Sequence, residues 1–494
     1  MTSLGSAEAV APAPSRVGRN FTALALGQLV TWTMTLLWTV IVPRALGPAG
    51  LGVIVTALAV TGVFSILLGL GTRNYLVREI VVDPAQAPSL VGTGIVLRLL
   101  LAPVFAGGII VYAHFAHYGH DATLVLYLAA LAGILTLLAE PMLAGFQAIE
   151  RMKYLAYSDV INKSSQGLVG IALVFLGFRA IGLTASMAVI GAGVFVLDLV
   201  WLRRFFPLDL RATWRRIVRM LRESVAYWAF GLFFMIYLWI DSVLLSLLTR
   251  SEVVGWYGVP MRLFQTLMFL PVLLSTVWLP RLVSAYEDSP ERLNKEARTP
   301  IELALLLSAP ICAGTAILAA PAIHLLYGSA YDNSVPVLII LGLCIPPMYL
   351  NIMLNQVLVA AKRQVLWAWV MAGATVVNPL LNLVLIPVTE NRYGNGAIGA
   401  SLSLLLTEAL IVVAGFVMIG REVLDRLLVR RAVLLALGGG GMWGAAYLAR
   451  PLGPVVSILV GALAFAAFAW VTGIVTSEHV ELVRATIRNR RRRD

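Results

Sequence analysis

The stretch GLFFMIYLWIDSVLLSLLTR (residues 231–250) has one acidic residue, Asp241, inside a run of apolar residues. As a helix, the run crosses most of the roughly 30 Å hydrocarbon core of a bilayer. An ionised carboxylate at that depth costs at least a few kcal/mol, so an acidic residue there usually has a partner or a function. The stretch therefore predicts a spanning helix and makes Asp241 a candidate functional residue.

The composition of the whole chain supports a membrane protein. Of its 494 residues, 60% are hydrophobic and 13% are charged, whereas soluble chains are about 45–50% apolar and about 25% charged. The net charge of +12 comes from basic residues that lie between apolar runs, which favours membrane topology over nucleic-acid binding. Its two cysteines, Cys312 and Cys344, each lie in an apolar run, so neither a disulfide framework nor a metal knuckle is expected.

Apolar runs of about 20 residues, the length of a spanning helix, predict an all-α polytopic protein with fourteen transmembrane helices. They lie near 21–43, 50–72, 90–114, 122–146, 157–178, 182–202, 224–249, 255–280, 300–326, 335–360, 365–388, 397–420, 430–449 and 453–476.

The connections between these runs predict the orientation. Of the 37 basic residues, 29 fall in connections on one side of the membrane. The other side has Arg44, Arg179, Arg250, Arg392 and Arg450. Because cytoplasmic connections are enriched in Lys and Arg, both termini are expected in the cytoplasm. The expected location is the cytoplasmic (inner) membrane.

Short repeated stretches predict two lobes. AGLGVI (49–54) and EVVGWY (252–257) each open a helix after a short outer turn, so that Gly52 matches Gly255. Parallel repeats of this kind are a transporter architecture with the substrate site between the lobes. We expect two six-helix lobes around a central cavity plus two C-terminal helices. The expected boundaries are a disordered tail at 1–19, the lobes at 20–204 and 223–421, a linker at 205–222, helices 13 and 14 at 422–478, and a basic tail at 479–494.

The linker contains RATWRRIVRMLRESV (211–225), whose apolar residues Trp214, Ile217, Val218 and Leu221 recur at helical spacing between arginines. This pattern is typical of an amphipathic helix on the anionic cytoplasmic leaflet. A cluster of arginines that only sets the topology is the alternative.

Five stretches, in this order, resemble the polysaccharide-transport branch of the multidrug/oligosaccharidyl-lipid/polysaccharide exporter superfamily. They are VPRALGPAGLGVI, GLGTRNYLVREI, IDSVLLSLLTRSEVVGWYGVPMRL, LLYGSAYDNSVPVLIILGL, and NPLLNLVLIPV followed by GAIGASLSLLLTE. The resemblance runs from about residue 20 to 420. It implies a flippase, with a cavity that is often basic, that carries a polyprenyl-diphosphate-linked oligosaccharide to the outer leaflet for cell-surface polysaccharide biosynthesis. It also implies that the helices after the twelfth help to accommodate the lipid tail.

Charged residues inside the predicted helices are the candidate site. Asp241 and Arg262 each lie about nine residues from the same outer turn, roughly 12–14 Å deep, which predicts that they pair across the hairpin. The pair can be structural, or either residue can contact substrate or a coupling ion. In the first lobe, Arg98, Glu140 and Lys163 share a depth, and Asp159 precedes Lys163 by four residues, a spacing that favours an ion pair. Arg98, Lys163 and Arg262 are candidate contacts for diphosphate.

Glu408 lies near the middle of the twelfth predicted helix without an obvious cation at its depth. It is either a proton-coupling residue or a protonated side chain in an interhelical hydrogen bond. Two i,i+4 pairs, Asn351 with Asn355 and Asn378 with Asn382, either line the cavity for sugar hydroxyls or join helices.

Other classes of function fit the sequence less well. The outer turn with His114, His117 and His120 lacks the fixed geometry of a metal site, and no phosphate-binding loop for ATP is present. We expect no catalytic residues, cofactor or metal. An ion-coupled drug exporter of the same superfamily is the main alternative, and a membrane glycosyltransferase or polymerase fits less well because the outer turns are short. Expected partners are membrane lipids and a polysaccharide polymerase or ligase, and a monomer is expected.

Overall fold

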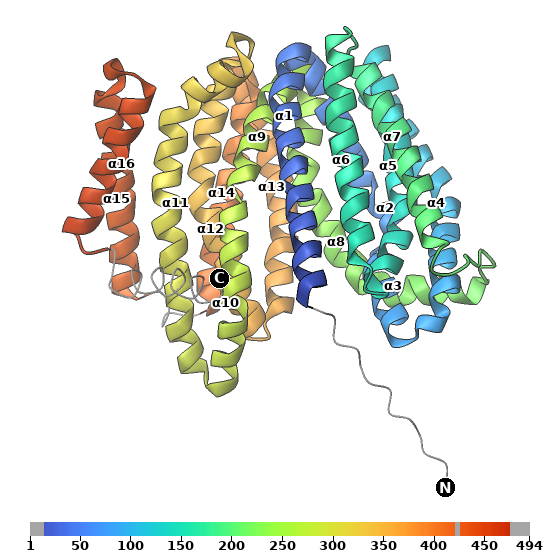
Figure 1. Ribbon diagram of the computed structural model, residues 1–494. Helices are drawn as coiled ribbons and strands as arrows, with labels where there is room; N and C mark the ends of the chain where they lie inside the picture. Colours follow the sequence, from blue (N-terminus) through green and yellow to red (C-terminus); the bar gives the residue numbers. More distant parts are fainter. Residues whose placement is uncertain (1–13, 420–424, 475–494) are drawn as a thin grey trace. The chain divides into compact units, whose positions relative to one another are not determined.

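The computed structural model describes residues 14–419 and 425–474 (Figure 1). The predicted basic tail at 479–494 lies outside these residues, as do residues 1–13 of the predicted disordered tail. Residues 14–19 of that tail are helical, because helix α1 begins at Pro14.

Every regular element within the described residues is a helix, which confirms the all-α prediction. The order is α1 (Pro14–Phe64), α2 (Ile66–Gly69), α3 (Thr72–Val82), η1 (Pro84–Gln86), α4 (Ala87–Ala116), α5 (His120–Ala148), α6 (Met152–Phe175), α7 (Ala180–Leu202), α8 (Trp214–Leu248), α9 (Ser251–Leu267), α10 (Phe269–Asp288), α11 (Pro290–Tyr327), η2 (Ser329–Tyr331), α12 (Ser334–Ala360), α13 (Gln364–Tyr393), α14 (Gly396–Ile419), α15 (Arg426–Leu448), η3 (Arg450–Leu452) and α16 (Pro454–Val471).

Ten helical segments in the described part of the chain are long and apolar enough to cross a membrane. The first of them includes two predicted spans, because α1 contains a non-helical residue, Gly47, with φ 68° and ψ 174°. Left-handed φ values of this kind suit glycine, which has no Cβ. Adding the second span and the apolar helices α6, α15 and α16, which coincide with predicted runs, gives the expected fourteen.

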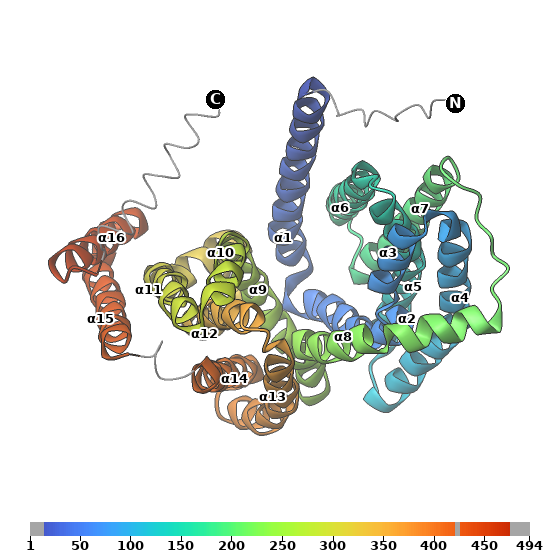
Figure 2. The same cartoon turned by 90° about the horizontal axis from the view of Figure 1, so that it is seen from below.

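The chain divides into two compact units. The first comprises Met1–Ala45 and Phe64–Gly231, and the second comprises Leu46–Val63 and Leu232–Asp494. The lobe boundaries expected from the sequence stay a prediction. In the second unit, α9 and α11–α14 enclose the apolar core, and Figure 2 looks along these helices.

The predicted amphipathic segment is the beginning of α8 rather than a separate helix. Ile217 and Met220 are buried in the core of the first unit. Trp214 is 73% exposed and Val218 is 42% exposed, so two residues assigned to the apolar face point outward. Contact with the leaflet stays a prediction.

The two glycines matched in the sequence repeat meet in the second unit. A Cβ atom on Gly52 of α1 would lie 1.7 Å from the backbone oxygen of Ser251, and one on Gly255 of α9 would lie 2.1 Å from the backbone oxygen of Pro48. Real Cβ contacts are essentially never below 3.0 Å. The two helices therefore touch backbone to backbone, which is possible only with glycine at both positions.

Candidate ion and substrate site

Asp241, on α8, lies in a buried polar cluster of the second unit. Only 3% of the residue is exposed. Asn382 of α13 donates from Nδ2 to Oδ1 of Asp241 over 2.6 Å, and the hydroxyl of Tyr257 on α9 donates to Oδ2 over 3.0 Å. Asn382 also donates to Oδ1 of Asn378, one turn earlier on α13, over 3.0 Å. The carboxylate is thus held by uncharged donors from two other helices.

The predicted ion pair between Asp241 and Arg262 is not among the ion pairs of the described residues, and Asp241 has neutral partners instead. Equal depth fixes the height of a side chain but not the face of the helix from which it projects. Tyr257, which faces Asp241, is five residues from Arg262, so at 3.6 residues per turn the two side chains leave α9 about 140° apart. Arg262 lies within electrostatic reach of Tyr327 at the end of α11.

Glu408, on α14, is another buried carboxylate of this unit, with 3% of the residue exposed. Its Oε1 accepts a short hydrogen bond from the hydroxyl of Tyr237 on α8. Its Oε2 accepts from Nδ2 of Asn351 on α12 over 2.5 Å. Interhelical hydrogen bonds, one of the two alternatives for Glu408, are therefore present. Asn355, one turn after Asn351, is partly buried.

Together these residues give two acidic groups in a spanning bundle, surrounded by hydroxyls and amides. Within the part of the chain that the structure describes, three amide atoms of the cluster have no hydrogen-bond partner, namely Oδ1 of Asn351, Nδ2 of Asn378 and Oδ1 of Asn382. Unsatisfied buried polar atoms are costly. Carboxylate and amide oxygens can bind protons or a monovalent cation, and the arrangement can therefore take up positive charge.

In the first unit, the predicted charge cluster divides into two separate pairs. Nη2 of Arg98, on α4, lies 2.5 Å from Oε2 of Glu140 on α5, and the Arg98 side chain is fully buried. The predicted pair of Asp159 with Lys163 is present on α6 at 2.9 Å, but both side chains are about half exposed. Equal depth suggested that Arg98, Glu140 and Lys163 form a single cluster. Depth alone does not give the position of each helix in the plane of the membrane.

One buried acid of the first unit was missed. Asp198 on α7 is fully buried, and its Oδ2 accepts from the hydroxyl of Ser158 on α6 over 2.9 Å. Its Oδ1 has no hydrogen-bond partner among the described residues. A signal was available, because Asp198 is the one charged residue within the predicted span 182–202. The sequence held no comparable signal for Tyr237 and Tyr257, since tyrosine is common in spanning helices.

The bundle of spanning helices and its buried acids define a polytopic membrane transporter. Residues 17–286 match the family described as polysaccharide biosynthesis protein, and the chain belongs to that family. Residues 224–384 also match the MatE family. No curated protein matches the chain.

Solved structures share the fold. A structure described as the lipid II flippase MurJ, inward closed conformation, is 13% identical with a TM-score of 0.73, covering 91% of this chain and 98% of that one. An inward-facing multidrug resistance MATE family transporter of the MOP superfamily is 14% identical with a TM-score of 0.61, over 82% and 95%. A MOP superfamily transporter from Pyrococcus furiosus is 16% identical with a TM-score of 0.52, over 81% and 94%. The two family matches, together with this shared fold, confirm the predicted superfamily, and the matched families are transporters and flippases.

Proposed function

We propose that the protein is an ion-coupled flippase that moves a lipid-diphosphate-linked oligosaccharide from the cytoplasmic to the outer leaflet, for cell-surface polysaccharide biosynthesis. The observation that carries ion coupling is the burial of Asp241 and Glu408 among neutral donors. Acidic residues in spanning helices are expensive and mark ion or proton pathways. The family match and the fold shared with a lipid II flippase support the class of substrate.

Uptake of a proton or a monovalent cation would neutralise a buried carboxylate and lower the cost of keeping it away from water. The hydroxyls of Tyr237 and Tyr257 donate hydrogen bonds that hold the two carboxylates in place while no ion is bound. A ligand shifts a conformational equilibrium only if it binds one state more tightly than the other. The ion therefore favours one state of the transporter if that state buries these acids more fully. Alternating access then couples ion entry to movement of the substrate.

Arg98, Lys163 and Arg262 are our proposed contacts for the diphosphate. In this conformation Arg98 is bonded to Glu140 and Lys163 to Asp159. A phosphate would therefore have to replace a carboxylate, and such an exchange keeps each cation paired throughout. A polymerase or ligase that receives the product is the proposed partner, and the protein acts as a monomer in the inner membrane with both termini in the cytoplasm.

The proposal is tested in vesicles that contain the purified protein and a fluorescent polyprenyl-diphosphate oligosaccharide, with a membrane-impermeant quencher reporting the outer leaflet. We expect flipping to depend on an imposed proton or sodium gradient. Asp241→Asn and Glu408→Gln should remove that dependence, whereas Asp288→Asn, at an exposed acid of α10, should not. Flipping at the same rate without a gradient, or with unchanged gradient dependence in both variants, would refute ion coupling through these residues.

An ion-coupled drug exporter is a second candidate, favoured by the match of residues 224–384 to the MatE family. The same vesicles distinguish the two. Gradient-driven transport of a fluorescent organic cation, together with no movement of the lipid-linked oligosaccharide, would identify the exporter.

A further inference from the structure

An apolar cavity of about 560 Å³ lies between α11, α12 and α15 of the second unit. Leu305 and Ala309 of α11, Leu343 of α12, and Leu435 and Trp443 of α15 are among its lining residues. Its volume falls within the range of about 300–1,000 Å³ that ligand pockets occupy. Because its walls belong to spanning helices, the molecules that reach it most readily are lipids.

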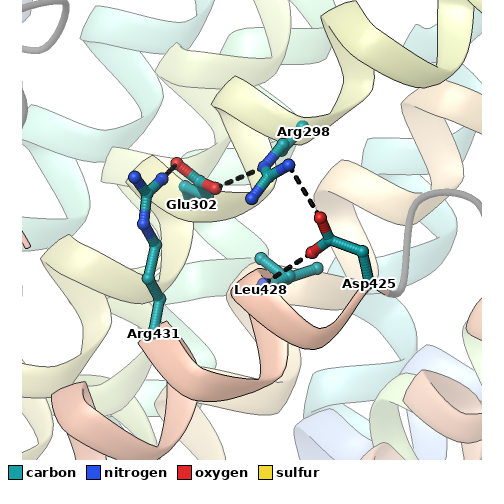
Figure 3. Close-up of polar contacts among 5 residues, drawn as sticks. All are labelled: Arg298, Glu302, Asp425, Leu428 and Arg431. Atoms are coloured by element: carbon teal, nitrogen blue, oxygen red, sulfur yellow. Dashed lines mark hydrogen bonds and ion pairs between the residues drawn. The ribbon is translucent and has the colours of Figure 1, made fainter.

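A charged network joins α11 to α15 (Figure 3). Arg298 donates from Nε to Oε1 of Glu302 over 2.7 Å and from Nη1 to Oδ2 of Asp425 over 2.9 Å. Arg431 donates to Oε2 of Glu302 through a short contact. Asp425 also caps α15, because its Oδ1 accepts from the backbone nitrogen of Leu428 over 2.7 Å.

The network closes one end of the cavity. Glu302 lies three residues before Leu305, which lines the cavity, so the two side chains share a face of α11 one turn apart. On α15, Arg431 directly precedes Ala432 and lies four residues before Leu435, both of which line the cavity. This end lies at the start of α15 and about three turns into α11, and it is the end nearer the cytoplasm in the orientation that we propose.

The charges at this end are unbalanced. Arg298, Arg426, Arg430 and Arg431 contribute four positive charges, and Glu302 and Asp425 contribute two negative charges, a difference of +2. Arg426 and Arg430 are exposed in the first turns of α15. Nη2 of Arg298 is buried and has no acceptor within the described ranges. The cavity therefore combines an apolar body with a cationic end that retains an unused donor.

We propose that this cavity binds an anionic glycerophospholipid of the cytoplasmic leaflet, with an acyl chain between α11, α12 and α15 and the phosphate beside Arg298 and Arg431. Basic side chains at a membrane surface attract anionic lipids. Glu302 and Asp425 neutralise two of the four positive charges. The remaining charge of +2 suits one phosphodiester better than a more highly charged diphosphate. The bound lipid fills the space between α15 and the rest of the second unit and so holds the last helices in place.

Cys312 provides a direct test because it lines the cavity and is one of two cysteines in the chain. The other, Cys344, is fully buried. The rate of Cys312 alkylation by N-ethylmaleimide is measured by peptide mass spectrometry in vesicles of phosphatidylcholine with or without phosphatidylglycerol. A bound acyl chain slows the alkylation of Cys312 by a factor of 1 + [lipid]/Kd. Lipid at four times Kd therefore gives about fivefold protection. We expect protection with phosphatidylglycerol and none with phosphatidylcholine alone.

Three variants make the test specific. Ala436→Leu fills the cavity from α15. The double variant Glu302→Gln/Arg431→Gln removes Arg431 and both ion contacts of Glu302, and it leaves Arg298 paired with Asp425. We expect that the anionic lipid no longer changes the labelling rate in either variant. Arg281→Gln, which removes a cation of α10 outside the network, should keep full protection. Equal labelling rates in both lipid mixtures for the wild type, or protection by undecaprenyl diphosphate but not by phosphatidylglycerol, would overturn the proposal.

Discussion

Replacement of Gly52 by alanine tests the closest helix contact of the second unit. The new Cβ would lie 1.7 Å from the backbone oxygen of Ser251, whereas contacts below 3.0 Å essentially never occur. The α1 segment and α9 must therefore separate by at least 3.0 − 1.7 = 1.3 Å along that line. Since the obstructing atom belongs to the backbone, no side-chain rotation can relieve the clash. Overpacking of this kind costs about 1–3 kcal/mol.

The assay is thermal unfolding of the purified protein in detergent. We expect Gly52→Ala and Gly255→Ala each to lower the midpoint, and the double variant to lose less than the sum, because one displacement relieves both clashes. Gly373→Ala is the matched control, since nothing lies within 4 Å of a Cβ at that position of α13. Alanine there should stabilise the helix by up to about 1 kcal/mol. A midpoint for Gly52→Ala equal to that of Gly373→Ala would refute the reasoning.

Two further predictions concern buried charge and orientation. Arg98→Gln or Glu140→Gln alone should each destabilise the protein, because breaking a buried pair costs about 3–5 kcal/mol, whereas the double variant should lose less; additive losses of thermal stability would show that the pair is not coupled. In intact cells an impermeant thiol reagent should label a cysteine at Ser251 but not one at Ser289, and the opposite pattern would invert the proposed topology.

The sequence predicted the spanning helices well because the bilayer imposes their length and composition. The run 365–388, for example, lies within α13. The match of Gly52 with Gly255 indicated a repeat, but not the contact that the two helices make at these glycines. The bounds were less accurate where a helix continues beyond the apolar run. α8 begins at Trp214, ten residues before the predicted span 224–249.

The candidate site was only partly predictable, because burial of charge is visible in a sequence but the rotation of each helix is not. Asp241 and Glu408 were recognised as acids among apolar residues. Their partners Tyr257 and Tyr237 were not, and Arg262 was chosen in their place. Glu302 lies in the predicted span 300–326, but the sequence does not reveal its partner Arg431, which lies 129 residues later in the chain. Contacts at that separation depend on how helices pack.

In the proposed transport cycle, the number of buried acids in the cluster of Asp241 and Glu408 limits how much work the membrane potential can do. In the ion coupling that we propose, Asp241 and Glu408 each accept one monovalent cation, so at most two elementary charges cross per turnover through this cluster. Each charge that crosses the whole membrane is worth about 2.3 kcal/mol per 100 mV. Two charges therefore supply about 4.6 kcal/mol, and since a tenfold ratio corresponds to about 1.4 kcal/mol, they can sustain an imbalance of substrate between the leaflets of about three powers of ten.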